Sequence, residues 1–400
     1  MIKHQICLGI IRQSQQNGRV STACVKVNGR DQTLDLLKGM GIFLMIYRHA
    51  RGPMSDFVLL FHMAIFFIAS GYLYHVQYAG DGRSVGMYIV KKIRGLYLPY
   101  FLYASAFVML NNLFLRLNIY TDNPAFLQAE GIEVAYTSLG SYYGVGTMLK
   151  KIVDVALFRS GTQIGGALWF FQTLFLVLIL YTVIEYTARK LLRDEQHIVL
   201  SQLIVSLVFL CLGYYCHLAN RSMHGFNRVF SVYVLIHIGR ILKQYHMMER
   251  VVKHGKRPVY VILTFVVLAL GYQRGNIALD KNNIENPAFF LVMSLTGWLL
   301  MYLLASFLTQ HRSWLNAGIA YLSQHSIPVI AMHFLGFKIV SWISVCIYGQ
   351  EPFMIAAFPV LQTSGLWWLA YTAVGIAFPL ALSGGGRWIL RRSRAILEGK

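Results

Sequence analysis

Ten long apolar segments recur along the chain, and they constrain its fold more than any other feature. They lie near residues 33–50, 56–77, 95–116, 166–187, 198–217, 229–246, 257–274, 288–308, 325–347 and 366–385. Each is long enough to cross a hydrocarbon core of about 30 Å, which takes roughly 17 to 25 helical residues. Continuous apolar runs do not match the alternating pattern of a membrane β-barrel, so we predict an all-α integral membrane protein with about ten transmembrane helices.

The composition also indicates a protein embedded in the lipid bilayer. Hydrophobic residues make up 56% of the chain and charged residues only 13%, whereas a soluble domain carries about 25% charged residues. The net charge of +20 is spread over short hydrophilic breaks, as in membrane loops, and does not indicate a nucleic-acid partner. The five cysteines show no metal-ligand spacing, so we expect no metal site.

The distribution of basic residues predicts the orientation of the chain. With the N-terminus in the cytoplasm, the inner breaks hold more than twice as many Lys and Arg residues as the outer breaks. The positive-inside rule then places both termini in the cytoplasm, with the protein in the inner (plasma) membrane. Residues 1–30 lack the pattern of a signal peptide and are interpreted as a cytoplasmic tail. We expect a transmembrane domain at 31–386 and a basic cytoplasmic tail at 387–400.

Ionisable residues lie inside several predicted helices, where they are costly and mark candidate functional sites. Lys38 is near the inner end of the first helix and His49 is at its outer end, a separation of about 16 Å at 1.5 Å per residue. His62 follows roughly two turns below the outer surface, so both histidines can face one outer cavity. We interpret His49, beside Arg48 and Arg51, as a candidate general base.

Plainer interpretations stay open for these residues. Lys38 can extend to the inner interface, as long basic side chains near helix ends often do. His62 can be a hydrogen-bonded core histidine, and His333, inside the ninth predicted helix, is either functional or bonded to another helix. Four further ionisable residues are placed near helix ends, where solvation is cheap, and receive no role: Glu185, His237, Arg240 and Lys338.

Two hydrophilic pieces flank the third predicted helix. The segment KKIRGLYLPYF places Lys91, Lys92 and Arg94 at its inner mouth, which suits a phosphate-rich ligand. The positive-inside rule alone also explains basic residues there. The outer break 117–164 contains LKKIVDVALF, an amphipathic piece that we expect to lie along the membrane surface.

Five motifs, in this order, resemble the membrane acyltransferase 3 family, in particular its polysaccharide O-acetylase-like branch. The motifs are LDLLKGMGIFLMIYRH, FHMAIFFIASGYLY, KKIRGLYLPYF, GALWFFQTLFLV and HSIPVIAMHFLGFK, and the resemblance covers residues 30 to 390 or so. It implies a transferase that takes an acetyl group from cytoplasmic acetyl-CoA, or another acyl group from its CoA thioester. The acceptor would be a hydroxyl of a cell-surface or lipid-linked glycan of the cell envelope.

The resemblance implies roles for particular residues. The family's basic residue, ten-residue spacer and histidine fall on Lys38 and His49, although many relatives carry arginine at the first position. Ala64 replaces a family proline and predicts a straighter second helix. The residues expected to bind the acyl-CoA donor are Lys38, Lys91, Lys92, Arg94 and Tyr100.

The same resemblance suggests how the acyl group is transferred. We expect His49 to remove the proton of the acceptor hydroxyl, with His62 or Arg48 stabilising the oxyanion. Direct transfer and a covalent acyl-histidine relay both stay open. Trp169 and His333 match the family's WF element and late-helix histidine and are expected to contact substrate.

Two other classes of protein also fit parts of the pattern. A secondary transporter would carry intramembrane histidines and cations too, but the sequence has no inverted repeat and no paired Gly/Pro-interrupted helices. A non-catalytic scaffold of a glycan assembly complex would tolerate replacement of the histidines. The sequence indicates neither the acceptor sugar nor an oligomeric state.

Overall fold

The computed structural model describes residues 26–27, 30–130, 132, 138–221, 223–253, 257–311 and 313–397. Most of the predicted tail at 1–30 lies outside the described residues. Within them, regular structure is helical except for two paired two-residue strands, β1 (Lys26–Val27) and β2 (Arg30–Asp31), and one isolated bridge between Ala278 and Asn283. The all-α prediction is confirmed for this part of the chain.

The helices follow the predicted apolar segments closely. The α-helices are α2 (Gln32–His49), α3 (Ser55–Leu59), α4 (His62–Tyr72), α5 (Gly82–Lys92), α6 (Leu98–Met109), α7 (Asn111–Arg116), α8 (Val145–Ala156), α9 (Trp169–Leu191), α10 (Glu195–Leu218), α11 (Phe226–Gln244), α12 (Met247–Lys253), α13 (Arg257–Tyr272), α14 (Pro287–Leu308), α15 (Trp314–Gln324), α16 (Ser326–Tyr348) and α17 (Trp367–Leu397). Shorter turns are η1 (Val76–Ala79), the π-helical η2 (Ile93–Tyr97), η3 (Pro124–Gln128), η5 (Gly166–Leu168), η6 (Met223–Gly225), η7 (Leu279–Lys281) and η8 (Pro352–Ala356). Helix α17 continues as a helix into the stretch predicted as the C-terminal tail.

Six helices of the described residues are long and apolar enough to cross a membrane, or up to seven if one bent pair counts as a span. They are Ser55–Tyr72, Gly166–Leu191, Glu195–Leu218, Pro287–Leu308, Ser326–Tyr348 and Trp367–Gly384, with α12 and α13 as the bent pair. The protein is therefore a multi-pass membrane protein, and ten spans are not confirmed. Helix α2 falls outside this set because it carries Asp35, Lys38 and Arg48. The cytoplasmic placement of both termini stays a prediction.

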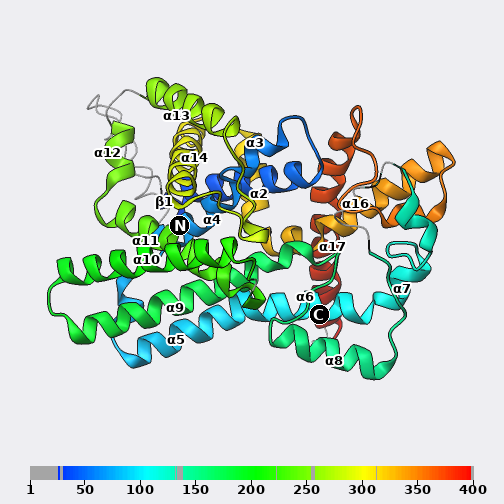
Figure 1. Ribbon diagram of the computed structural model, residues 1–400, viewed down its shortest axis with the longest axis horizontal. Coiled ribbons are helices and arrows are strands. Elements are labelled where there is room, and N and C mark those ends of the chain that lie inside the picture. The colour runs from blue at the N-terminus through cyan, green and yellow to red at the C-terminus, as the bar shows by residue number, and fades with distance from the viewer. Residues whose placement is uncertain are drawn as a thin grey trace.

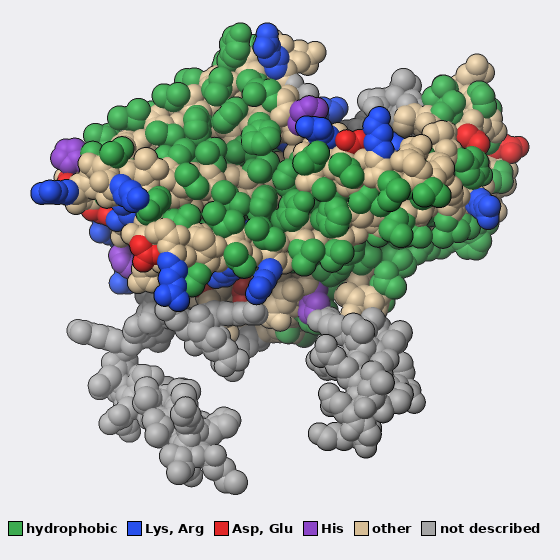
Figure 2. All heavy atoms as spheres, turned by 90° about the horizontal axis from the view of Figure 1, so that it is seen from below, with side chains coloured by type: hydrophobic (Ala, Val, Ile, Leu, Met, Phe, Trp, Pro, Cys, Tyr) green, Lys and Arg blue, Asp and Glu red, His purple; other side chains and the backbone are tan. Residues whose placement is uncertain are grey.

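Apolar side chains cover much of the outer surface. Figure 2 shows one face on which they predominate, with charged side chains gathered mostly toward its edges. On α10, Leu200, Ile204 and Val208 recur at helical spacing and are each more than half exposed. Such a stripe is expensive in water and is expected where a helix faces lipid.

Helix α2 lies near the centre of the molecule and packs against α4, α14, α15 and α17 (Figure 1). It begins where the Asp31 carboxylate accepts a hydrogen bond from the backbone N–H of Leu34, a standard N-cap that satisfies an otherwise unpaired donor. Its apolar positions Leu37, Ile42 and Ile46 are fully buried. This packing holds both ends of the helix, with their ionisable side chains, against other elements.

Two glycines bring α4 and α11 into close contact. A Cβ atom at Gly71 would lie 2.0 Å from the carbonyl oxygen of Ile236, and one at Gly239 would lie 2.1 Å from that of Ile68. Only glycine permits this approach, which is a common way for membrane helices to associate. The crossing seats α4, and His62 at its start, against the protein interior.

The second predicted helix is interrupted between α3 and α4, three residues before Ala64, and the straighter course expected from that alanine stays a prediction. Phe61 leaves the helical conformation with φ −143° and ψ −20°. Its side chain packs against Gly297 of α14, where a Cβ atom would lie 2.1 Å from that of Phe61. Tight packing against a neighbouring helix therefore accompanies a break where no proline is present.

Helices α5 and α6 follow one another through η2, and α8 packs along α6 (Figure 1). The hydroxyl groups of Tyr97 and Tyr100 donate hydrogen bonds to the carbonyl oxygens of Ala156 and Val155, 3.0 and 3.3 Å away. The amphipathic piece predicted in the outer break, 149–158, thus overlaps most of α8, whose C-terminal end is bonded to η2 and the start of α6.

Candidate active site

A cavity of about 290 Å³ lies at the C-terminal end of α2. Its wall comes from that helix end, the α3/α4 break, η5 with the start of α9, the loop 276–281, α16 and Phe358–Pro359. His49, His62 and Arg48 all line it, as does Trp169. Two imidazoles and a guanidinium from residues 48–62 therefore share one cavity with wall segments that are distant in the sequence.

The backbone fixes the hydrogen positions of His62. Its ring is 3% exposed, and Nδ1 lies 3.0 Å from the carbonyl oxygen of Val58, one turn before the helix break. Because a carbonyl oxygen can only accept, Nδ1 must carry the hydrogen. In the neutral imidazole, Nε2 then holds the lone pair and can accept a hydrogen bond or a proton.

His333 is arranged in the same way but lies behind His49. It is fully buried, and its Nδ1 lies 3.0 Å from the carbonyl oxygen of Ile330. Its ring stacks on that of His49 with centroids 5.3 Å apart, and Phe334 packs against both rings. Within the described residues, Nε2 of His333 has no hydrogen-bond partner. His333 is not among the residues that line the cavity, so it supports the ring of His49 there, and its predicted substrate contact stays a prediction.

Arg48 is held by an ion pair at the rim. Its Nη2 lies 2.9 Å from Oδ1 of Asp56, and its side chain is 16% exposed. The Asp56 side chain is more than half exposed, and its carboxylate restricts the Arg48 guanidinium. Arg48 nevertheless still lines the cavity. The arrangement keeps a fixed positive charge beside His49.

Trp169 also lines the cavity and contacts Arg228, whose guanidinium carbon lies 5.2 Å from the ring centroid. Arg228 also donates to the carbonyl oxygen of Asp280, 2.9 Å away, in the loop that lines the cavity. Sequence reasoning missed both Arg228 and this loop. The available signal is weak, because a single arginine at the start of a predicted helix, such as Arg228, is common in membrane proteins.

A second cavity, of about 510 Å³, lies at the N-terminal end of α2. Its lining residues are Asp31, Leu34, Asp35, Lys38, Tyr72, Leu73, Tyr74, His75, Lys243, Ser323 and Gln324. Lys38 forms an ion pair with Asp35 at 3.2 Å, and the ammonium of Lys243 lies 5.0 Å from the ring centroid of Tyr72. Helix α2 therefore has one cavity at each end.

The other predicted donor-binding residues do not line this second cavity. Lys91 contacts Tyr78 and Lys92 lies over the ring of Tyr88, and both tyrosines pack against Tyr74 of the cavity wall. Burial lowers the pKa of Lys92 to about 8, with repulsion from Lys91 as a smaller cause.

Two members of the predicted donor set lie apart from these lysines. Arg94 is exposed on η2, and Tyr100 is buried where it bonds to Val155. Lys38 alone of the predicted set lines the cavity.

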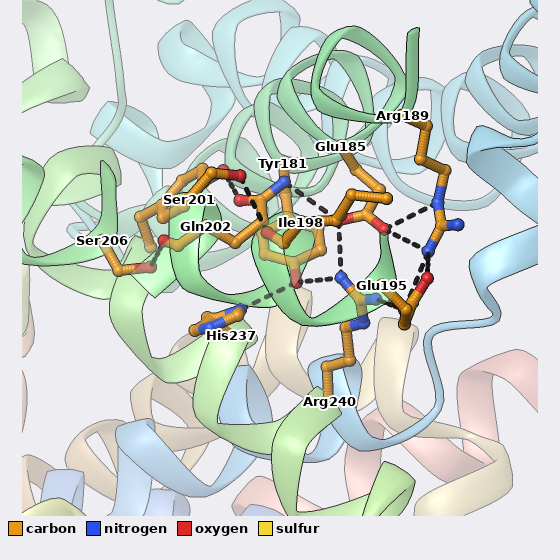
Figure 3. A network of polar contacts seen from close by, with 11 residues as sticks. Tyr181, Glu185, Arg189, Glu195, Ile198, Ser201, Gln202, Ser206, His237 and Arg240 are labelled. Carbon is orange, nitrogen blue, oxygen red and sulfur yellow. Dashed lines mark hydrogen bonds and ion pairs between the residues drawn. The ribbon is translucent and has the colours of Figure 1, made fainter. Parts of the chain in front are cut away.

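Four ionisable residues predicted to be solvated at helix ends are buried instead: Glu185, His237, Arg240 and Lys338 are at most 3% exposed. Glu185 accepts hydrogen bonds from Arg240 at 2.5 Å, from Arg189 at 2.9 Å and from Gln202 at 3.0 Å (Figure 3). Arg240 also pairs with Glu195 at 2.7 Å, and the Tyr181 hydroxyl lies 3.1 Å from Nδ1 of His237. The prediction was wrong for Glu185, His237 and Arg240 because α9, α10 and α11 cover one another at this end, where Glu185 and Arg240 pair with each other. It was wrong for Lys338 because the backbone of η8 covers that part of α16.

These features define a class: a multi-pass membrane protein with a histidine-lined cavity at one end of a central helix. A family model described as an acyltransferase domain matches residues 31–384. The chain therefore belongs to the acyltransferase 3 family, which confirms the resemblance noted in its sequence and implies acyltransferase activity. Comparisons with curated proteins and with solved structures found no match.

Proposed function

We propose that the protein transfers an acyl group, acetyl in the simplest case, from acyl-CoA to a hydroxyl of a cell-envelope glycan. The observation that carries the proposal is the cavity in which Arg48 and His49, at the end of α2, meet His62, at the start of α4. The family assignment supports acyl transfer as the reaction. The CoA donor, the glycan acceptor and a location in the inner membrane are parts of the proposal.

The second cavity suits the phosphate end of the donor. Lys38 and Lys243 bring two cations to it from α2 and α11, beside the carboxylates of Asp31 and Asp35. Charge-assisted contacts from such ammonium groups to phosphate are strong. The separation of Lys38 and His49 along α2 is about 16 Å, comparable with an extended pantetheine arm. A donor bound by its phosphates at one end of α2 can therefore present its thioester at the other end.

The chemistry then needs one base and one source of positive charge. The imidazole of His49 takes the proton of the acceptor hydroxyl while the hydroxyl oxygen attacks the thioester carbonyl. The C–S bond breaks as the tetrahedral intermediate collapses, and the CoA sulfur leaves with the proton that His49 returns. Arg48 is the better oxyanion donor, because Nδ1 of His62 is already bonded to Val58. The lone pair on Nε2 of His62 suits it to orient the acceptor hydroxyl.

Replacement of His49 tests this proposal. His49→Gln keeps bulk and hydrogen bonding but cannot take up a proton near neutral pH, so acetyl transfer should fall about 10² to 10⁴-fold. Binding of acetyl-CoA should be retained. His197→Gln is the matched control, because His197 is exposed and its ring contacts Asp194, the N-cap residue of α10, away from the cavity. If purified His49→Gln protein transfers acetyl nearly as fast as the control, the base lies elsewhere.

A further inference from the structure

Lys338 is a buried charge that the proposed chemistry does not use. It lies on α16, little more than one turn after His333, and is 3% exposed. Helix α16 is one of the candidate membrane spans, where a charged side chain is costly and is retained only for a reason. Within the described residues it forms no ion pair.

Its three hydrogens go to three consecutive carbonyl groups. The ammonium donates to the carbonyl oxygens of Ile355, Ala356 and Ala357 at 3.0, 3.1 and 2.6 Å. These carbonyls stand at the end of η8, where the last carbonyls of a helical turn have no partner within the turn. An ammonium has three donors, so Lys338 is saturated by the backbone that it holds.

The residues that follow this clamped segment form the cavity wall. Phe358 and Pro359 both line the cavity beside His49. The ring of Phe358 packs against Phe334 with centroids 4.6 Å apart, and the Phe334 ring lies 4.8 Å from that of His49. The ammonium of Lys338 is itself 5.8 Å from the Phe358 ring centroid. One line of contacts therefore runs from Lys338 to the imidazole of His49.

We propose that Lys338 is a positioning residue for acyl transfer: it fixes the segment 355–357 and, through Phe358 and Phe334, the aromatic wall against which the His49 ring is held. The inference rests on the proposed function, because Lys338 acts only by positioning His49 and takes no part in a chemical step itself. A loosened wall has two consequences. The His49 ring loses its orientation, and water gains access to the thioester.

Water that enters produces hydrolysis in place of transfer. The water oxygen attacks the thioester carbonyl, the C–S bond breaks, and the products are free CoA thiol and the carboxylic acid. The ratio of CoA released to acetyl groups recovered on glycan then rises above one. A residue needed only for folding would reduce the amount of protein without changing that ratio in the protein that remains.

The test is Lys338→Met, which keeps the length of the stem and removes all three donors. Acetyl-CoA is the donor and the membrane glycan fraction of the source cells is the acceptor, with thiol release and acetyl-glycan formation measured together. We expect kcat to fall on the order of 10²-fold, as misplacement of a catalytic group commonly does. The KM for acetyl-CoA should stay within about twofold, because the second cavity is untouched. The release-to-transfer ratio should rise several-fold.

Three further variants make the outcome decisive. Lys338→Arg keeps the hydrogen-bond donors and the charge, so its ratio of CoA release to acetyl transfer should stay close to that of the native protein. Phe358→Ala keeps the clamp but removes the ring, and it should reproduce the hydrolysis even if Lys338→Met cannot be purified. Cys346→Ala, on the same helix but exposed, is the control and should match the native protein.

The results separate the two proposals. An unchanged ratio and kcat in Lys338→Met, or in Phe358→Ala where the first variant cannot be obtained, overturns the positioning role. A native protein that releases no CoA with any acceptor fraction overturns the proposed function instead.

Discussion

Replacement of Glu185 by glutamine should cost about 3 kcal/mol of unfolding free energy, the lower end of the range for breaking a buried ion pair. Glu185 is fully buried and its carboxylate meets Arg240 at 2.5 Å, Arg189 at 2.9 Å and Gln202 at 3.0 Å. The substitution keeps the shape of the side chain and removes its charge. Two guanidinium groups are then left with Glu195, which is 43% exposed, as their carboxylate partner. This remaining pairing is why we expect the lower end of the range.

The assay is unfolding in mixed micelles with increasing denaturing detergent, followed by loss of helical signal. Glu249→Gln is the control, because Glu249 pairs with Lys243 at 3.7 Å and both side chains are about a third or more exposed. Such a pair is worth about 0 to 1 kcal/mol. The double variant Glu185→Gln with Arg240→Gln should lose less than the sum of the two single losses, since it leaves fewer unpaired charges. If Glu185→Gln costs no more than Glu249→Gln, the network of Figure 3 does not hold α9, α10 and α11 together.

Three other outcomes are expected. Gly239→Val should lower yield and stability, because its side chain would collide with the backbone of Ile68. Gly86→Ala, with nothing within 4 Å of the added Cβ atom, should be neutral. Equal behaviour of the two variants would contradict the close crossing of α4 and α11. Lys38→Ala and Lys243→Ala should raise the KM for acetyl-CoA more than Arg94→Ala does, and the increase should be larger at high salt. A larger increase for Arg94→Ala would instead place the phosphates of the donor at η2. Cysteines placed at Tyr142 and Lys253 should react with impermeant reagents from opposite sides of the membrane, and labelling from one side would refute the predicted topology.

Much of the fold was predictable because apolar length is a strong signal. The segments at 288–308 and 325–347 match α14 and α16 to within a residue, since continuous hydrophobic runs with clear breaks leave little freedom in where a helix starts and ends. The break at Phe61 was not predictable. It accompanies a contact with Gly297, which is distant in the sequence, so the residues around Phe61 alone do not indicate it.

In the candidate site, too, some features are indicated by the local sequence and others depend on contacts with distant segments. His49 and His62 were recognised because ionisable residues stand out inside apolar segments. The same rule failed for Glu185 and Lys338, because position along a helix does not reveal which neighbours cover its end. The loop 276–281 was missed for a related reason, since it contributes shape to the cavity and carries no distinctive chemical pattern.

Helix α2 sets a fixed distance between the cavities at its two ends, and this distance has a consequence for acyl-group selectivity. A helix has a fixed rise, so under the proposed function every CoA donor bound at Lys38 would place its thioester at the same height beside His49. The CoA arm is identical in all such donors. The distance between the two cavities therefore depends on the CoA moiety and does not distinguish acyl chains of different length. Discrimination between acetyl and longer acyl chains must then fall on the walls beyond His49, where the rings of Phe334 and Phe358 set the remaining room.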